Sequence, residues 1–312
     1  MEKIPVTAVT GPTASGKTRL AVELAHRFNA EVVSADSMQV YKGMDIATAK
    51  PTVEEMQGIK HHLVDFLDPG TPFSVAKYCA LAGECISDIH KRGKNVVLAG
   101  GTGLYIEHLL ENIQLTETPC EPGLREHLRK RLEDEGATAL LKELEKTDSQ
   151  TAARLHPNDT GRIIRALEIY YSSGITISEQ TARSRLQPSP YDPLYLGLDF
   201  KDRGKLYERI DARVDKMLED GLVEEAKAFL ALPEAATASQ AIGIKELQPY
   251  FNGECTLEHA VCEIKKSTRH YAKRQLTWFR RNDKMNFLFV DEYDSFDALA
   301  EAAAEKVKAF KR

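Results

Sequence analysis

The sequence lacks any apolar run of about 18 residues, the length that a membrane-spanning helix needs. Its first residues, 1–5, lead directly into a short apolar stretch and carry no pattern of a secretory signal peptide. These absences argue against a membrane-embedded or secreted protein. We expect a cytoplasmic protein with no membrane partner.

Cysteine is scarce and scattered, at Cys79, Cys85, Cys120, Cys255 and Cys262. None of these residues lies in a C-x-x-C pair or beside histidines at metal-ligand spacing, so we expect neither a disulfide framework nor a zinc site. The adjacent pair His61-His62 does not change this expectation. Neighbouring side chains on a strand point to opposite faces, which favours a structural role for both.

An excess of positive charge is also absent, because 42 Lys and Arg stand against 47 Asp and Glu, for a net charge of −5. The overall charge therefore does not predict a nucleic-acid partner. With 312 residues, 42% of them hydrophobic and 29% charged, the chain is long enough for one large domain or two. Its function must be sought in local motifs and in the distribution of charge.

Segments rich in β-branched residues alternate with helical patterns near the amino terminus. Residues 4–10, 31–35 and 95–99 predict strands, and residues 18–28 and 75–92 predict helices. This alternation indicates an open, mostly parallel α/β sheet with helices on both faces.

The pattern changes at residue 119 to helices without a convincing strand. These predicted helices cover residues 124–135, 137–146, 149–155 and 160–172. An apolar run at 194–198 then indicates a return to the sheet, and long helices are predicted at 203–230 and 257–281. We therefore predict a core of residues 1–118 and 189–312, interrupted by an all-helical domain of residues 119–188.

A phosphate-binding motif stands between the first predicted strand and helix, the context that it requires. The residues Gly11, Pro12, Thr13, Ala14, Ser15, Gly16, Lys17 and Thr18 match G-x-x-x-x-G-K-[ST]. Backbone amides of such a loop surround a phosphate, Lys17 adds compact positive charge, and the Thr18 hydroxyl is an expected Mg²⁺ ligand. The motif predicts a P-loop NTPase-like fold.

Nucleotide hydrolysis is disfavoured, because the strand at 95–99 ends in Gly100 rather than in the aspartate that a hydrolase places near its metal. The bound diphosphate need not belong to a nucleotide. Ligands of an open α/β sheet gather beyond the carboxyl ends of its strands, so Asp36 and the turn at 100–103 should face the phosphate loop. Asp36 is a candidate base or metal partner; a turn or N-cap aspartate is the alternative.

Positive charge is concentrated near the carboxyl end of the chain. Between residues 265 and 284 lie Lys265, Lys266, Arg269, Lys273, Arg274, Arg280, Arg281 and Lys284, against the single acid Asp283. Interleaved with them are His270, Tyr271, Trp278 and Phe279. This mixture predicts phosphate contacts and stacking on unpaired bases, and a solvated basic helix face is the alternative.

The chain resembles the tRNA dimethylallyltransferase (tRNA isopentenyltransferase) family over nearly its full length. The matching blocks, in order, are GPTASGKT from Gly11, SADSMQVYKGMDIATAKP from Ser34, HHLVD from His61, GGTGLYI from Gly100, HPND from His156, RIIRALEIY from Arg162 and AKRQLTWFR from Ala272. Several such blocks in the right order are far more specific than a phosphate loop alone.

The resemblance implies transfer of a dimethylallyl group from dimethylallyl diphosphate to N6 of the adenosine 3′ to the anticodon. The expected tRNAs read codons that begin with U, and the target adenosine is flipped out of its stack. It also implies a Mg²⁺ cofactor, a monomer, and a helical insert that contacts the tRNA anticodon stem-loop.

The resemblance also implies roles for individual residues. Asp36 accepts a proton or a hydrogen bond from the adenosine N6 amine. The other implied catalytic residues are Thr13, Lys17, Thr102 and Arg213. The loop 11–18 and Arg213 hold the diphosphate. The implied tRNA contacts are Asp36, Ser37, Met38, Gln39, Thr102, Arg125, Gly161, Arg162, Ile163, Ile164, Arg165, Gln240, Ile242, Gly243 and Lys245. From the basic segment we add Lys273 and Arg274 as expected tRNA contacts. For Arg213 the alternative is an ion pair on a helix surface.

Three other functions remain open at this point. An adenylate isopentenyltransferase would prenylate free AMP, ADP or ATP, but it would not need the helical insert or the basic segment. A small-molecule or nucleotide kinase would share the phosphate loop and consume ATP. A non-catalytic RNA-binding P-loop protein would show no prenyl transfer.

Overall fold

The computed structural model describes residues 3–113, 123–184, 186–232 and 238–310. Its contacts divide the chain into two compact units. We call Met1–Leu110 with Pro190–Arg312 the P-loop unit, and Glu111–Ser189 the helical unit. The predicted start of the insert at residue 119, like Cys120, lies outside the described residues.

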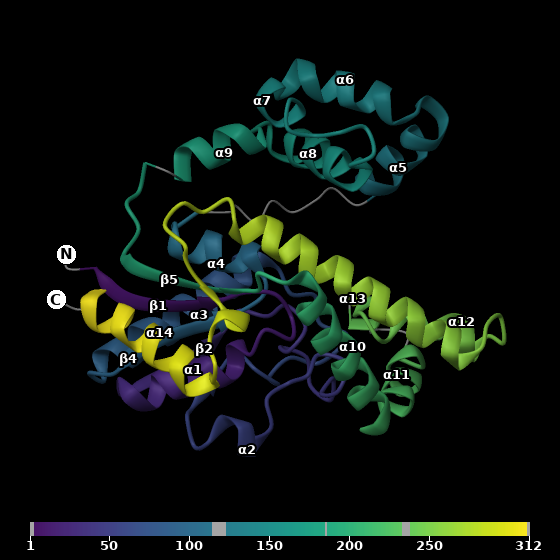
Figure 1. Cartoon of the computed structure of the whole chain (residues 1–312). Helices are drawn as coiled ribbons and strands as arrows, with labels where there is room; N and C mark the ends of the chain where they lie inside the picture. Colours follow the sequence, from purple (N-terminus) through teal and green to yellow (C-terminus); the bar gives the residue numbers. More distant parts are fainter. Residues whose placement is uncertain (1–2, 114–122, 185, 233–237, 311–312) are drawn as a thin grey trace. The chain divides into compact units, whose positions relative to one another are not determined.

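A parallel sheet forms the centre of the P-loop unit (Figure 1). In the described residues it has six strands in the order β3-β2-β4-β1-β5-β6, and all neighbouring strands run parallel. The strands are β1 (Ile4–Thr10), β2 (Ala30–Ser34), β3 (His61–His62), β4 (Asn95–Gly100), β5 (Tyr191–Asp199) and β6 (Asn286–Phe289). The prediction of an α/β fold with a mostly parallel sheet is confirmed.

Helices cover both faces of this sheet, which is why its strands are almost continuously apolar. On one face pack α1 (Lys17–Arg27) and α14 (Phe296–Phe310), and on the other α3 (Val75–Lys91) and α4 (Gly103–Leu110). The first core includes Leu20, Leu24, Leu299 and Val307, and the second includes Tyr78, Ile86, Ile106 and Leu109. The sequence patterns located α1 and α3 but not β6 or α14.

A further group of helices extends the P-loop unit beyond the carboxyl ends of the strands. It comprises α10 (Arg203–Glu219), α11 (Leu222–Leu230), α12 (Gln248–Phe251) and α13 (Leu257–Phe279), while α2 (Val53–Met56) is a short separate helix. The prediction of one helix over 203–230 was wrong. The chain turns at Gly221, whose φ of 102° is left-handed and favours glycine, and α11 starts in a new direction.

The helical unit contains α5 (Leu124–Glu135), α6 (Ala137–Thr147), α7 (Ser149–Ala152), α8 (Thr160–Ser173) and α9 (Ile177–Ser184). No strand occurs among its described residues, as the sequence predicted. Its core is formed by apolar residues at helical spacing, including Leu128, Leu140, Leu144, Ile163 and Leu167. The structure therefore gives this segment a hydrophobic core of its own.

None of the helices in the described part of the chain is long and apolar enough to span a membrane.

A buried carboxylate on β2 gathers three cationic or titratable side chains. Glu31, whose side chain is 4% exposed, accepts hydrogen bonds from Arg92 at 2.6 and 2.7 Å and from Lys94 at 2.9 Å. The His62 ring lies 2.7 Å from the same carboxylate, which gives this histidine a structural contact. Bonding to Arg92 holds the pKa of Glu31 well below its usual range, although burial opposes this shift.

Replacement of Glu31 by Gln should lower the free energy of unfolding at pH 7 by about 1–3 kcal/mol, because charged hydrogen bonds in a buried setting are lost. Since the pKa of Glu31 is lowered by folding, its contribution is present above the ordinary value of 4.5 and declines as pH falls below it. Urea titrations at pH 7 and near pH 4 measure both effects. Asp88→Asn, which removes an exposed partner of Arg92, is the control and should cost less than about 1 kcal/mol. Equal losses in the two variants would contradict this role.

Candidate active site

Two glycines shape the phosphate loop between β1 and α1. A Cβ on Gly11 would lie 2.7 Å from the Leu198 carbonyl oxygen, so the loop passes too close to β5 for any side chain. Gly16 has a φ of 91° and directly precedes α1. The non-glycine Ala14 also has a left-handed φ, of 62°, which is a strained conformation of the kind found at functional sites.

The loop is closed on itself through one carbonyl group. The Pro12 oxygen accepts hydrogen bonds from the Ser15 amide at 3.4 Å, the Ser15 hydroxyl at 2.8 Å and the Lys17 ammonium at 2.6 Å. Lys17 therefore bends back over the loop, and its side chain also lines the cavity described below.

Asp36 follows β2 and anchors a tight turn. Its Oδ1 accepts hydrogen bonds from the amides of Met38 at 2.9 Å and Gln39 at 3.2 Å. The Oδ2 atom has no hydrogen-bonding partner among the residues that the structure describes. The turn role, which was the alternative for Asp36, is therefore present, and it leaves one carboxylate oxygen for chemistry.

Thr102 joins the turn after β4 to this segment. Its hydroxyl oxygen lies 3.1 Å from the Ser37 amide that donates to it and 3.4 Å from the Ser37 hydroxyl. Burial raises the pKa of the nearby Tyr271 well above its usual value, and an interaction with the Thr102 side chain partly opposes this shift. These contacts show Thr102 orienting its neighbours, and a direct catalytic or tRNA contact stays a prediction.

Gln275 on α13 is a site residue that the sequence analysis did not single out. Its Oε1 accepts from the Thr13 amide at 2.9 Å, and its Nε2 donates to the Gly101 carbonyl at 2.9 Å. A Cβ on Gly101 would lie 2.1 Å from Nε2, so this bridge needs glycine at position 101. The residue lies within the quoted block AKRQLTWFR, but nothing in that block indicates its partners.

A cavity of about 320 Å³ opens beside the phosphate loop, a size typical of small-molecule sites. The predicted site residues that line it are Thr13, Lys17, Thr18, Asp36, Ser37, Met38, Gln39, Arg213, Gln240, Ile242, Lys245 and Arg274. Residues far apart in the sequence thus meet in one cavity of the P-loop unit. Other lining residues, among them Val214, Met217 and Ile264, make part of its wall apolar.

Positive charge dominates this cavity. Among its described lining residues, Lys17, Arg213, Lys245 and Arg274 are cationic, whereas Asp36 is the one acid. Burial, and secondarily the nearby Arg213, lower the pKa of Lys17 to about 7, and Asp36 only partly opposes this. Burial also lowers the pKa of Arg213. An anion bound here would relieve the cost of confining two cations together.

The structure does not bring every predicted residue to the cavity. Gly243 is buried and does not line the cavity, and its left-handed φ of 98° gives a conformational reason for glycine there. Ile163 and Ile164 are 0% and 7% exposed in the core of the helical unit, which is incompatible with RNA-facing side chains. The exposed members of that predicted stretch are Gly161, Arg162 and Arg165.

Arg125 and Arg165 also belong to the helical unit. Each forms an ion pair of 2.7 Å with the buried carboxylate of Glu168, yet their side chains are 46% and 44% exposed. Glu168 therefore holds two arginines at the surface in a defined orientation. A tRNA contact by either arginine remains a prediction.

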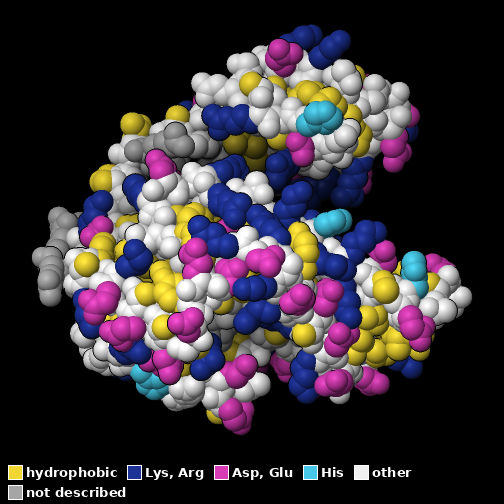
Figure 2. Space-filling model, in the orientation of Figure 1, with side chains coloured by type: hydrophobic (Ala, Val, Ile, Leu, Met, Phe, Trp, Pro, Cys, Tyr) yellow, Lys and Arg dark blue, Asp and Glu magenta, His cyan; other side chains and the backbone are white. Residues whose placement is uncertain are grey.

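The basic segment near α13 is divided into paired and unpaired charges. The paired residues are Lys265 with Asp215, Lys266 with Glu263, Arg269 with Asp211, and Arg280 with Asp199. In the part of the chain that the structure describes, Lys273, Arg274, Arg281 and Lys284 have no carboxylate partner. Figure 2 shows Lys and Arg side chains gathered where Figure 1 places α13.

The aromatic residues of this segment differ from the prediction. Phe279 is 3% exposed and belongs to the core, so its predicted stacking on bases was wrong. Trp278 is held against Gly103, where a Cβ would lie 2.4 Å from the indole ring. Tyr271 lines the cavity and His270 is exposed. Helical spacing alone did not separate the core face of α13 from its exposed face.

The fold and the cavity define an α/β protein with a phosphate-loop motif and a largely cationic cavity that holds one carboxylate. The family model described as IPP transferase matches residues 39–282, and the chain belongs to that family. The phosphate loop precedes the matched segment.

Relatives over nearly the whole chain carry the name tRNA dimethylallyltransferase, which confirms the resemblance found in the sequence. The protein of Caldanaerobacter subterraneus subsp. tengcongensis is 48% identical over 301 residues, covering 96% of both chains. That of Bacillus subtilis (strain 168) is 48% identical over 290 residues, covering 93% of this chain and 91% of the relative.

Solved structures of the family share the fold. The tRNA isopentenylpyrophosphate transferase of Bacillus halodurans is 40% identical, with a TM-score of 0.71 and full coverage of both chains. A eukaryotic dimethylallyltransferase acting on tRNA is 32% identical, with a TM-score of 0.80, covering 97% of this chain and 78% of that one.

The lowered pKa of Lys17 predicts that diphosphate binding takes up a proton. Near pH 8 the unliganded Lys17 amine should be mostly neutral, because this pH is above its pKa of about 7. A bound anion favours the ammonium form, so binding of methyl diphosphate should take up as much as about one proton, and its affinity should fall as pH rises above 7.

Calorimetry in two buffers of different ionisation enthalpy measures this proton uptake. Lys17→Met should bind more weakly and take up no proton in this pH range. Uptake that persists in Lys17→Met would assign the proton to another group.

Proposed function

We propose that this chain transfers a dimethylallyl group from dimethylallyl diphosphate to N6 of the adenosine 3′ to the anticodon. The proposed tRNAs read codons that begin with U, and diphosphate is released. Family membership supports the reaction class. The observation that carries the proposal is that one cavity holds the phosphate loop, Arg213 and the carboxylate of Asp36.

The phosphate loop, Lys17 and Arg213 would bind the diphosphate and stabilise it as the leaving group. When the allylic C–O bond breaks, its electron pair goes to the diphosphate, whose new charge is offset by cations already confined in the cavity. The apolar wall at Val214, Met217 and Ile264 suits a five-carbon prenyl chain and limits the access of water to its cation.

Asp36 would serve the nucleophile. A bond forms between adenosine N6 and the prenyl carbon that carried the diphosphate oxygen, and the surplus N6 proton passes to the carboxylate. Oδ1 is held by the Met38 and Gln39 amides, so Oδ2 is the oxygen oriented to accept this proton. Ser37, Met38 and Gln39 would then line the adenine.

Mg²⁺ is part of the proposal, and the donors available fit its usual mode of binding. The described residues contain no cluster of three or more His, Cys, Asp or Glu that could enclose a metal. Mg²⁺ commonly takes only one or two protein oxygens and completes its shell with phosphate oxygens and water. The Thr18 hydroxyl, which lines the cavity, would hold the ion, and the ion would add positive charge against the diphosphate.

A tRNA anticodon stem-loop is the proposed acceptor rather than a free nucleotide. Exposed cations support this choice in each unit: Arg162 in the helical unit, and Lys273 and Arg274 on α13. Contacts with phosphates at such positions are a general source of affinity for nucleic acids. Gln240, Ile242 and Lys245 line the cavity and are proposed to contact the tRNA there.

The deciding assay incubates the purified chain with radiolabelled dimethylallyl diphosphate, Mg²⁺ and unmodified tRNA that carries adenosines beside its anticodon. AMP and ATP are offered as parallel acceptors. Label in tRNA alone supports the proposal, and label in AMP or ATP would favour an adenylate isopentenyltransferase. No label in any acceptor, together with ATP-dependent phosphorylation, would favour a kinase.

Asp36→Asn should lower kcat by roughly 10²- to 10⁴-fold, the usual contribution of a general base, with little change in tRNA affinity. Asn keeps an oxygen for the Met38 and Gln39 amides, so the turn is retained. Asp36→Ala removes the turn contacts as well and should also weaken tRNA binding. Single-turnover rates and filter binding separate the two effects. Unchanged turnover in Asp36→Asn would remove Asp36 from proton transfer.

Replacing Lys273 and Arg274 together by Ala should weaken tRNA binding and reduce the slope of log affinity against log salt by about 1–2, as expected for up to two lost phosphate contacts. The matched control replaces Lys265 and Lys266, which lie on the same helix but pair with Asp215 and Glu263. The control should change the slope less. If the two double variants gave equal slopes, the basic face of α13 would be a solvated surface that does not contact tRNA.

A further inference from the structure

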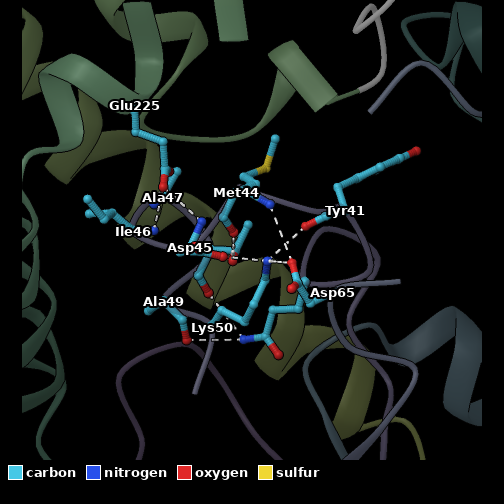
Figure 3. A network of polar contacts seen from close by, with 12 residues as sticks. Tyr41, Met44, Asp45, Ile46, Ala47, Ala49, Lys50, Asp65 and Glu225 are labelled. Atoms are coloured by element: carbon cyan, nitrogen blue, oxygen red, sulfur yellow. Dashed lines mark hydrogen bonds and ion pairs between the residues drawn. The ribbon is translucent and has the colours of Figure 1, made fainter. Parts of the chain in front are cut away.

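One carboxylate from α11 binds three successive backbone amides of a loop that borders the cavity (Figure 3). Glu225 Oε2 accepts from the Asp45 and Ile46 amides, both at 2.8 Å, and Oε1 accepts from the Ala47 amide at 2.8 Å. All three distances are typical of charge-assisted hydrogen bonds. The contact joins residues 178–180 positions apart in the chain.

Without Glu225, these three amides would lack a hydrogen-bond acceptor within their own turn. Residues 46–49 form a single helical-type turn, closed by the Ala49 amide on the Ile46 carbonyl at 2.9 Å, and the amides that open such a turn have no partner within it. A carboxylate at this position supplies acceptors and suits the positive end of the turn. Glu225 therefore acts as an N-terminal cap supplied by another helix.

The capped turn forms part of the cavity wall. Ala47, Thr48 and Ala49 all line the cavity. Gln39 Nε2 donates to the Thr48 and Ala49 carbonyls, both at 3.2 Å, and the Gln39 amide donates to Asp36 Oδ1. A continuous set of hydrogen bonds thus runs from Glu225 through the turn and Gln39 to Asp36.

Lys50 secures the other side of the same loop. Its ammonium donates to the Tyr41 carbonyl at 2.8 Å and pairs with Asp45 at 2.5 Å and Asp65 at 2.6 Å, and its side chain is 7% exposed. These partners all lie within residues 41–65, so Lys50 folds the loop locally. Glu225, by contrast, links this loop to α11, because its carboxylate accepts hydrogen bonds from the loop amides.

Close packing supports the same contact. The Cβ position of Gly221, at the start of α11, lies 3.7 Å from the Ile46 side chain, and that of Gly243 lies 3.7 Å from Ala47. Both distances are ordinary van der Waals contacts, and both glycines have a left-handed φ, of 102° and 98°. The start of α11, which carries Glu225, therefore packs against the same loop whose amides Glu225 binds.

We propose that Glu225 is a positioning residue for the acceptor side of the reaction. By holding the turn at 45–49, it fixes Gln39 and the orientation of Asp36 toward the incoming adenosine, while the donor side at the phosphate loop is independent of it. This inference rests on the proposed function for its kinetic consequence, but the structural contact can be tested without any activity.

Glu225→Gln is the informative variant, because glutamine has a single acceptor oxygen and would turn an NH₂ group toward at least one of the amides. We expect kcat/KM for tRNA to fall by about 10- to 100-fold, as for a misplaced catalytic group, with the affinity for dimethylallyl diphosphate unchanged within about twofold. The matched control is Glu224→Gln, an exposed neighbour on the same helix that makes the same change of charge, and it should leave both quantities unchanged.

Hydrogen exchange of the Asp45, Ile46 and Ala47 amides supplies the second readout. They should be protected in the wild type and in Glu224→Gln, and should exchange faster in Glu225→Gln while the sheet amides do not change. Equal loss of donor and acceptor affinity would show a general structural role and overturn the proposal, as would normal tRNA kinetics with unprotected amides.

The two proposals fail in different ways. A wild-type chain that transfers no prenyl group, but whose three amides lose protection only in Glu225→Gln, would overturn the proposed function and leave the contact in place. A wild type that is active and whose amides are unprotected would overturn the role of Glu225. If Glu225→Gln fails to fold, protection of the three amides in the unmodified chain still decides whether the contact exists.

Discussion

The site depends on a close approach of backbone at the carboxyl ends of the strands, where side chains would not fit. A Cβ on Gly100 would lie 2.2 Å from the Ala35 carbonyl oxygen, and that same oxygen accepts a hydrogen bond from the Thr102 amide. Because glycine occupies this turn, β2 and β4 end side by side, and α13 can pack Gln275 and Trp278 directly on the turn. The end of β2 delivers Asp36, and Gln275 joins α13 to the phosphate loop. Side chains on the glycines of this turn would push these segments apart.

Charge in the cavity is arranged differently from charge elsewhere in the P-loop unit. Glu31 and Asp199 are buried carboxylates, each bonded to arginine, so their charges are balanced within the protein. Lys17 and Arg213 share a cavity whose described walls offer only Asp36 as an acid, and burial lowers the pKa of both. Confining like charges in this way lowers stability. The fold accepts that cost at the place where an anionic ligand would offset it, which is the arrangement expected of a binding site rather than of a structural ion pair.

Local signals in the sequence predicted much of this architecture. The phosphate loop, β1, β4, α1, α3, α5 and α13 each carry a motif or a periodicity contained within their own residues. The break at Gly221 was missed because the apolar spacing of α10 and α11 runs on across a single glycine. Phe279, Ile163 and Ile164 were placed in functional roles because a block of residues indicates function without indicating which side of its helix faces the core. Gln275 and Glu225 were missed because their partners lie 174 or more residues away, a separation that no local pattern records.

The donor and acceptor sides of the cavity consequently differ in how they are specified. The phosphate loop takes its shape from its own glycines and from the Pro12 carbonyl, with Gln275 as a long-range support. The acceptor side has local bonds at Asp36 and Lys50, but its direction relative to the cavity is set by a carboxylate from α11. A phosphate loop is shared by proteins of many activities, so the loop alone specifies binding of a phosphate group and not the acceptor. The acceptor is specified by the surrounding helices. Among these, α11 contacts the acceptor side through Glu225, which binds three amides of the loop next to Gln39 and Asp36.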